Sequence, residues 1–150
     1  PPPPPPRSPE PHVSRWPLLL LACIFVPAAR AQEPAPARTT KDGVYSRAQW
    51  LRGQDLYAGN CRSCHTPESH AGAMFNVTWN GRTLSELYAY IRGNMPKADP
   101  GSMTSQEYAD VLAYILRLNR MPAGQDDLPT DSTALHTIRF VTTIPVRKDP

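Results

Sequence analysis

The sequence predicts an all-α fold in which three main helices are joined by long loops. Apolar side chains recur at helical spacing in two segments, at Leu84, Leu87, Tyr88 and Ile91 and again at Tyr108, Val111, Leu112, Ile115 and Leu118. A third segment, ahead of these two, starts with a residue type that commonly caps helices. The alternating pattern of a strand is weak and confined to residues 138–144.

The first helix is expected at about residues 46–60, with Ser46 as its N-cap. Gly53 stands in the middle of this helix, where a glycine destabilises by about 1 kcal/mol relative to alanine. A glycine at such a position usually has a packing reason. We therefore expect the last helix to approach closely at Gly53, with Val111 and Tyr114 packed across it.

The second helix is expected at about residues 83–92, and Gly93 would end it. The third helix is the most strongly marked, because Thr104 and Glu107 have the spacing of a capping box. Its apolar face continues up to Asn119.

Residues 66–82 are expected to form a loop rich in small residues, with apolar content at Met74, Phe75, Val77 and Trp79. Three short helices and a long loop enclose only a small core. The fold therefore needs a further apolar body around which to pack.

The pentapeptide Cys61-Arg62-Ser63-Cys64-His65 follows directly on the first helix. C-x-x-C-H is the covalent attachment signature of c-type haem. Two cysteines one helical turn apart can present both sulfurs to the two vinyl groups on one edge of a porphyrin. His65 is then carried under the iron, where its imidazole can serve as the proximal ligand. The motif predicts one covalently bound haem c in the chain.

Two other interpretations of this motif are weaker. A structural zinc site requires four ligands, usually as two separated pairs, and neither Cys23 nor the other histidines form a second pair. A thioredoxin-like redox pair would follow a strand in a βαβ unit, whereas a helix is expected before Cys61.

Residues 1–31 are expected to be a secretory signal peptide. Two arginines precede an apolar run over residues 16–26, and Ala29-Arg30-Ala31 has the pattern of a cleavage site. We expect cleavage after Ala31 and a mature protein in the periplasm. The apolar run is shorter than the roughly twenty residues that span a bilayer, so an uncleaved anchor is a weaker interpretation, as is lipidation at Cys23.

The chain of 150 residues is long enough for one domain with tails. Its formal net charge of +3 includes three arginines and one glutamate of the expected leader, so the chain from Gln32 carries +1. Such a small charge does not imply binding to nucleic acid, and no membrane association is implied once the leader is removed. We expect a flexible linker at 32–45, a haem domain at 46–121 and a C-terminal extension at 122–150.

Four segments carry a resemblance to a known family: Gly53-x-x-x-Tyr57-x-x-x-Cys61-x-x-Cys64-His65, Trp79-Asn80-Gly81-Arg82-Thr83-Leu84, Tyr90-Ile91-Arg92-x-x-Met95-Pro96 and Tyr108-Ala109-Asp110-Val111-Leu112-Ala113-Tyr114-Ile115-Leu116. With them, residues 46–124 resemble the class I cytochromes c, particularly the small bacterial branch found in or beside quinoprotein dehydrogenases and cbb3-type oxidases. The resemblance implies the cytochrome c fold, with three helices and long loops wrapped around one haem. It also implies that the haem is linked through Cys61 and Cys64 and that His65 and Met95 are the axial ligands.

One departure concerns the partner of the His65 imidazole. Many relatives follow the haem motif with a Gly-rich loop whose proline carbonyl holds the proximal histidine. Residues 66–70 take the place of that loop here, which leaves the partner of His65 open.

Four methionines are available as the sixth ligand, namely Met74, Met95, Met103 and Met121. Met74 would need an almost fully extended loop to reach round the porphyrin. Met103 stands at the start of the last helix and Met121 beyond its end. Met95 begins the irregular stretch after the second helix, thirty residues after His65, which is long enough to cross to the opposite face. Met95 is therefore the expected partner of His65 on the iron.

Four other residues are candidates for contact with the haem. Trp79 and Arg82 would hydrogen-bond or charge-pair with the propionates, the alternative for Trp79 being a surface residue partly buried against the loop. His70 and His136 are weaker candidates for a bis-His site. His70 lies only five residues after His65 and is expected to be exposed.

A thioether opposite a histidine saturates the iron and suits electron transfer. The expected function is that of a periplasmic monohaem electron carrier between redox partner proteins, a dehydrogenase or an oxidase, with no catalytic residues of its own. A dedicated cytochrome subunit of a periplasmic dehydrogenase or respiratory complex is the close alternative, because residues 135–144 would offer a larger apolar contact surface. A haem peroxidase or gas sensor with an open sixth position is a third hypothesis, and the sequence offers no distal acid–base pair for it.

Overall fold

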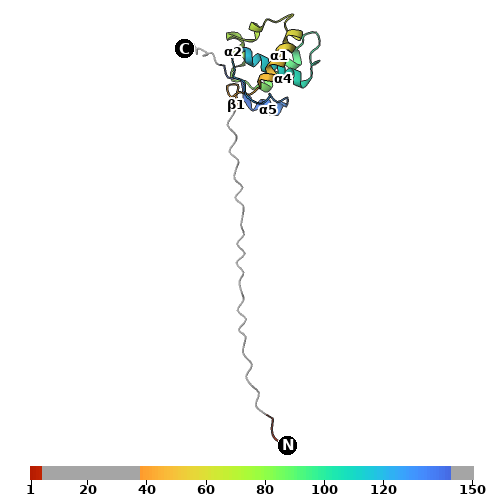
Figure 1. Cartoon of the computed structure of the whole chain (residues 1–150), viewed down its shortest axis with the longest axis vertical. Helices are drawn as coiled ribbons and strands as arrows, with labels where there is room; N and C mark the ends of the chain where they lie inside the picture. The colour runs from red at the N-terminus through yellow and green to blue at the C-terminus, as the bar shows by residue number, and fades with distance from the viewer. Residues whose placement is uncertain (5–37, 143–150) are drawn as a thin grey trace. The chain divides into compact units, whose positions relative to one another are not determined.

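A computed structural model describes residues 1–4 and 38–142 of the chain. The rest of the expected signal peptide, with residues 32–37 and 143–150, lies outside the described residues. Residues 38–142 hold five α-helices, one 3₁₀ helix and two strands of two residues each, in agreement with a mainly α-helical fold (Figure 1). In this part of the chain, none of the helices has the length and apolar character needed to cross a bilayer.

The three main helices form where the local sequence predicts them. α1 (Arg47–Asn60) begins after Ser46, whose hydroxyl accepts a hydrogen bond from the Gln49 N–H at 3.0 Å. α3 (Leu84–Asn94) and α4 (Ser105–Leu118) each begin with a capping box, in which a threonine hydroxyl and a glutamate carboxylate bond to each other's backbone N–H groups. The predicted caps at Ser46 and Thr104 are confirmed.

Helices α1 and α4 pack against each other at the centre of the domain (Figure 1). Gly53 is buried at their closest approach, because a Cβ placed there would lie 1.8 Å from the Asp110 carbonyl oxygen and 3.1 Å from the Tyr114 Cβ. The predicted close approach at Gly53 is confirmed. Around this contact the core is filled by fully buried side chains, the largest of which are Tyr45, Tyr57, Tyr108, Phe140, Leu84, Leu87, Leu112, Ile115, Leu116, Met121, Leu128 and Leu135.

The segment expected as a loop at residues 66–82 is in fact partly helical. It contains the 3₁₀ helix η1 (Pro67–His70) and the short helix α2 (Ala73–Trp79). α2 places Phe75 and Trp79 one turn apart and buries both, so tertiary packing stabilises a helix of two turns that has no side-chain cap at its start.

Residues 38–45 are not part of a flexible linker, and that prediction is wrong for them. Strand β1 (Arg38–Thr39) pairs in parallel with β2 (Ile138–Arg139). Val44 and Tyr45 are buried in the core, and the Tyr45 hydroxyl donates a hydrogen bond to the Met121 carbonyl at 2.5 Å. The apolar side chains of this segment anchor it to the domain.

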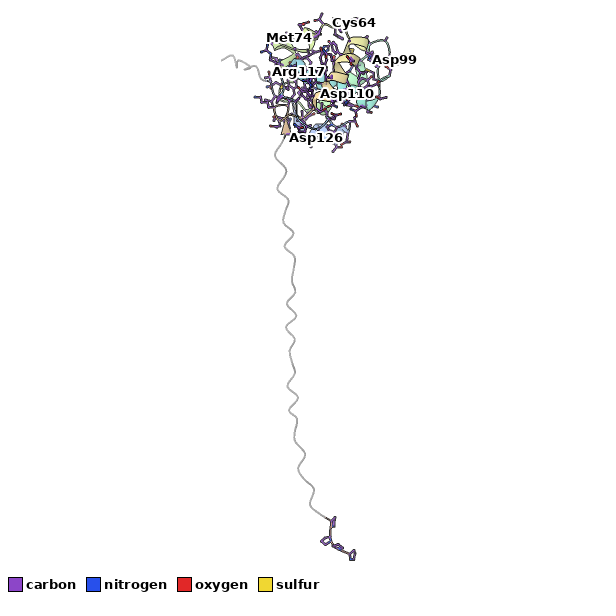
Figure 2. The ribbon with its side chains drawn as sticks, viewed as in Figure 1. Cys64, Met74, Asp99, Asp110, Arg117 and Asp126 are labelled. Carbon is purple, nitrogen blue, oxygen red and sulfur yellow. The ribbon has the colours of Figure 1, made fainter. Side chains whose placement is uncertain are left out.

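The segment after residue 121 is likewise part of the domain as far as residue 142. Helix α5 (Ser132–His136) packs on α3, and Leu135, Ile138 and Phe140 are at most 1% exposed. The prediction that residues 135–144 offer an apolar contact surface is therefore wrong for these side chains, because they face the protein's own core. Figure 2 shows Cys64 and Asp126 at opposite edges of the domain, so the start of this segment lies away from the haem motif.

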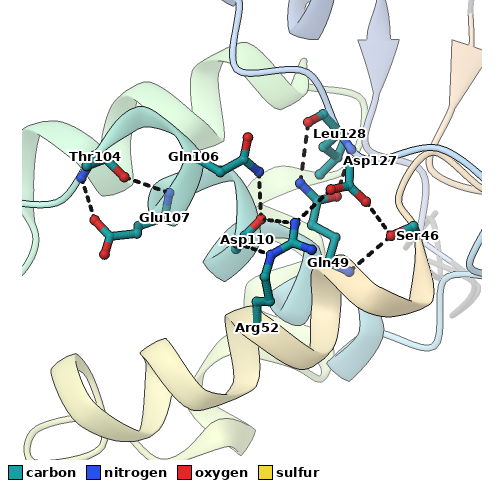
Figure 3. Close-up of polar contacts among 9 residues, drawn as sticks. All are labelled: Ser46, Gln49, Arg52, Thr104, Gln106, Glu107, Asp110, Asp127 and Leu128. Carbon is teal, nitrogen blue, oxygen red and sulfur yellow. Dashed lines mark hydrogen bonds and ion pairs between the residues drawn. The ribbon is translucent and has the colours of Figure 1, made fainter.

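A polar network joins that segment to α1 and α4 (Figure 3). The Arg52 guanidinium donates to both carboxylate oxygens of Asp110, at 2.7 and 3.0 Å, and to Asp127 at 2.7 Å. Ser46 donates to the same Asp127 carboxylate. The Gln49 side chain exchanges two hydrogen bonds with the backbone of Leu128. The partners lie on three parts of the chain, namely the start of α1, α4 and residues 127–128. The network therefore fixes the segment against the start of α1.

Candidate functional site

The C-x-x-C-H pentapeptide forms a compact turn at the end of α1. The backbone N–H of Cys61 still bonds to the Tyr57 carbonyl at 2.9 Å, and those of Cys64 and His65 both bond to the Cys61 carbonyl, at 3.1 and 2.9 Å. Both cysteines are free thiols. Cys61 is half-buried, and burial raises the pKa of its thiol. Cys64 is exposed.

The turn forms one wall of a cavity between α1, α3 and α4. The cavity contains about 950 Å³ of space free of protein atoms, including the part that is open to solvent. It is lined by Tyr57, Asn60, Cys61, Ser63, Cys64, His65, His70, Phe75, Trp79, Leu87, Tyr90, Ile91, Met95, Pro96, Lys97, Ala98, Val111 and Ile115. The structure thus brings Cys61, Cys64, His65, Met95 and Trp79 to one cavity, although they come from three different segments: the pentapeptide, the end of α2 and the end of α3.

Arg82 does not line this cavity. It lines an adjoining hollow that shares His65, His70 and Trp79 with the cavity. Its guanidinium lies 4.4 Å from the centre of the Trp79 ring and pairs with the Glu86 carboxylate at 3.1 Å. Arg82 is therefore at the mouth of the site rather than inside it.

The cavity has the chemistry that a haem requires. Its walls carry Leu87, Ile91, Val111 and Ile115, which suit a flat apolar macrocycle. An imidazole nitrogen and a thioether sulfur are the axial donor pair found in cytochromes c, and two thiols in C-x-x-C-H spacing suit the porphyrin edge. The residues present therefore fit a covalently attached haem.

The four methionines are in different environments. Met95 lines the cavity, whereas Met74 is 81% exposed and Met121 is 2% exposed in the core. Met103 is half-buried against the core. The last three do not line the cavity.

His70 lies beside His65, which the sequence did not lead us to expect. The centres of the two imidazole rings are 4.8 Å apart, and the Tyr57 hydroxyl is 2.9 Å from the His70 Nδ1. His70 is half-buried, so the prediction of an exposed histidine is wrong. Burial, and after it the charge of His65, lowers the pKa of His70. Burial is also the main cause that raises the pKa of Tyr57 to about 12.

The sequence left open whether Trp79 faces the haem or lies at the surface. Trp79 is buried, with 6% of its surface exposed. Its ring lies 6.3 Å from that of Phe75 and 5.5 Å from that of Tyr90. It is therefore a wall of the site and not a surface residue.

The sequence predicts no role at the site for Tyr90 or Lys97, which both line the cavity, and it indicates His70 only as a weak candidate for an iron ligand. Tyr90 and Lys97 are exposed polar or amphipathic residues with no local pattern that marks them. They reach the site because α3 and the segment after it lie across from the haem motif. Such neighbours follow only from the tertiary arrangement.

Comparison with known proteins identifies the domain. Residues 48–115 match the family model described as cytochrome c oxidase, cbb3-type, subunit III. Over 100 residues, 62% of this chain, the sequence is 31% identical to the cytochrome bc1 complex cytochrome c subunit of Corynebacterium diphtheriae. The chain covers 35% of that protein's length. No solved structure matches the chain at a significant level. The family match and the relative together support the identification of this domain as a c-type cytochrome.

Proposed function

We propose that residues 38–142 form a monohaem electron-transfer domain that carries haem c in the cavity between α1, α3 and α4. The observation that carries this proposal is that one apolar cavity is lined by both cysteines of the C-x-x-C-H motif, by His65 and by Met95. Bound haem c would supply a one-electron couple of its iron. The chain would supply attachment, axial ligands and an environment that sets the potential.

Cys61 and Cys64 would hold the porphyrin through two thioether bonds, and His65 and Met95 would occupy the two axial positions. With both positions filled by the chain, no exchangeable site remains for a substrate, which favours electron transfer over catalysis. The exposed Cys64 supports a haem edge near solvent, where an electron could pass to a partner. The aromatic wall of Trp79 and the charge of Arg82 are suited to the propionates, although Arg82 would have to share its guanidinium with Glu86.

The comparisons favour a second form of the same function, in which the domain is a subunit of a respiratory complex. One is a subunit of a cytochrome bc1 complex by its name, and the matched family is described as an oxidase subunit. We infer that the domain serves either as a free carrier in the periplasm or as the cytochrome part of a respiratory complex. Both the free carrier and the complex subunit would be exported by the expected leader at residues 1–31. Size and subunit composition of the protein purified from native membranes and periplasm would distinguish them, since a carrier purifies alone and a subunit with its partners.

Covalent attachment is the most direct test. The full chain should be produced with a c-type haem maturation system and extracted with acidified organic solvent, with haem measured in both phases. We expect haem to stay on the polypeptide. Cys61→Ala and Cys64→Ala should each lower or abolish the yield of holoprotein, whereas Ser63→Ala, between them, should not. Release of all haem into the organic phase would refute the proposal.

A further inference from the structure

The hydroxyl of Tyr108 links the two ends of the segment that begins at Met95. Tyr108 lies in the first turn of α4 and is 1% exposed. Its hydroxyl donates a hydrogen bond to the Met95 carbonyl at 2.7 Å and accepts one from the Gly101 N–H at 3.0 Å. One buried oxygen therefore holds both ends of residues 95–101, which we call the Met95 strap.

The Met95 strap has other anchors in its backbone: the Met95 N–H bonds to the Ile91 carbonyl at 2.8 Å, and the Asp99 carbonyl accepts from the Ser102 N–H at 3.3 Å. Residues 97–101 are exposed, and within the strap a turn is closed by the Asp99 N–H on the Pro96 carbonyl at 3.0 Å. Gly101 has a φ of +84°, a conformation that favours glycine. The Met95 side chain lines the cavity while its own carbonyl is bound to Tyr108. The hydrogen bond of the Tyr108 hydroxyl thus acts on the backbone of the same residue, Met95, whose side chain lines the cavity.

We propose that Tyr108 is a positioning residue whose hydroxyl holds the Met95 strap and thereby sets the strength of the Met95–iron bond. This inference rests on the proposed function, in which Met95 is the sixth ligand. Without the hydroxyl, the Met95 carbonyl and the Gly101 N–H lose a buried partner, and the strap gains freedom to move. A mobile strap holds its thioether on the iron less firmly, so external ligands displace Met95 more easily.

Tyr88 offers a matched control. Its ring stands edge-on to that of Tyr108, with the ring centres 6.3 Å apart, and it is 4% exposed. Its hydroxyl donates to the Ser105 carbonyl at 3.1 Å. Tyr88→Phe therefore removes one buried hydroxyl from the same aromatic pair, and the hydrogen bond that it removes goes to α4 and not to the Met95 strap.

The experiment compares the full-length holoproteins of wild type, Tyr108→Phe, Tyr88→Phe and Met95→Ala. Imidazole is titrated into the ferric protein, and the methionine-to-iron charge-transfer absorption and the reduction potential are recorded. We expect Tyr108→Phe to bind imidazole about tenfold more tightly than wild type, a factor typical of a lost buried hydrogen bond. The absorption should weaken and the potential fall. Tyr88→Phe should match wild type in all three measurements, even where its melting temperature falls as far as that of Tyr108→Phe.

Equal imidazole affinity in the two tyrosine variants would overturn the proposal, because the hydroxyl would then be only structural. Met95→Ala separates this result from a failure of the proposed function. If Met95→Ala keeps the absorption and potential of wild type, then Met95 is not a ligand, and the ligand assignment falls together with this inference, whereas covalent haem attachment is tested separately. If Tyr108→Phe does not accumulate, all four proteins are compared in a background that carries Gly59→Ala. This substitution should stabilise α1, because alanine is the better helix former and nothing lies within 4 Å of a Cβ at Gly59.

Discussion

The main chain of Gly53 lies directly against that of Asp110, where a Cβ on Gly53 would be 1.8 Å from the Asp110 carbonyl oxygen. A Cβ on Gly53 would clash with a backbone atom of α4, and a backbone atom cannot move aside as a flexible side chain can. The distance between α1 and α4 therefore depends on the absence of a side chain at this one position.

Gly53→Ala should separate the two helices and lower the free energy of unfolding by about 1–3 kcal/mol or more, the range of overpacked cores. Gly59→Ala is the control on the same helix, and there the gain in helix propensity should give no loss and up to about 1 kcal/mol of added stability. Thermal and urea unfolding of the two holoproteins would measure the contrast. Equal stability of the two variants would mean that the α1–α4 contact is looser than described.

Asp127 makes the stability of the domain depend on acid pH. The hydrogen bond from Ser46 and, after it, the hydrogen bond and the charge of Arg52 hold the pKa of Asp127 below its ordinary value of 3.8, against the opposing effect of burial. A carboxylate with a lowered pKa in the folded state stabilises above its unfolded pKa, and that stabilisation is lost as the pH falls through the folded pKa.

Asp127→Asn should therefore lower the free energy of unfolding at neutral pH by about 1 kcal/mol or less, since the pair with Arg52 is partly solvent-screened. The difference from wild type should shrink as the pH falls below 3.8. Asp126→Asn, at the exposed neighbouring residue, should show no such trend. The free energy of unfolding by urea, measured from pH 7 down to pH 3, checks both variants. A difference that stays constant over this range would contradict the proposed role of the carboxylate.

Phe140 tests whether the segment after residue 121 is a structural part of the domain. Its side chain is fully buried, and its ring centre lies 5.9 Å from that of Phe75 on the cavity wall. Its backbone N–H bonds to the Arg82 carbonyl at 2.8 Å. The segment therefore supports α2 and the start of α3 from behind.

Phe140→Ala should lower the free energy of unfolding by about 3–5 kcal/mol, as is usual for a buried phenylalanine. Val77→Ala on the exposed face of α2 should change it by less than about 0.5 kcal/mol. Chemical unfolding followed by the haem absorption and by far-UV circular dichroism would give both values. Similar small losses in the two variants would show that residues 122–142 are dispensable for stability.

Helices α1, α3 and α4 could be predicted because their start signals are local. Ser46, Thr83 and Thr104 each accept a hydrogen bond from a backbone N–H three residues on. Behind Thr83 and Thr104 the sequence also shows the apolar period of a helix. α2 lacks such a signal, since its N-cap is Gly72 with no side-chain hydrogen bond. α2 forms because its side chains Phe75 and Trp79 are buried in the core.

The part of the fold made by distant partners could not be predicted. Arg38 pairs with Ile138 across a hundred residues, and neither strand is longer than two residues, so neither carries a recognisable pattern. The buried side chains of the C-terminal segment, such as Leu128 and Leu135, are separated by polar residues that resemble a loop. Leu128 meets α1 through Gln49, and the helix of Leu135 meets α3, only after folding.

The site divides in the same way. Cys61, Cys64 and His65 are recognisable because haem attachment requires them within five residues. Met95 had to be chosen among four methionines by chain length and position, and its place in the cavity is consistent with that choice. The proximity of His70 to His65 could not be foreseen, because it depends on the contact of His70 with Tyr57.

The last prediction concerns the sixth ligand itself. Met95 lines the cavity, whereas Met74 is 81% exposed and Met103 packs against the core. Met95→Ala should abolish the methionine-to-iron charge-transfer absorption of the ferric protein and lower the reduction potential, because the thioether stabilises the reduced iron. The reduced variant should also bind CO, which a Met-capped iron resists. Met74→Ala and Met103→Ala should keep the absorption, the potential and the resistance to CO. Loss of the absorption in Met103→Ala, with Met95→Ala unchanged, would assign the ligand to the other methionine and place the strap outside the coordination of the iron.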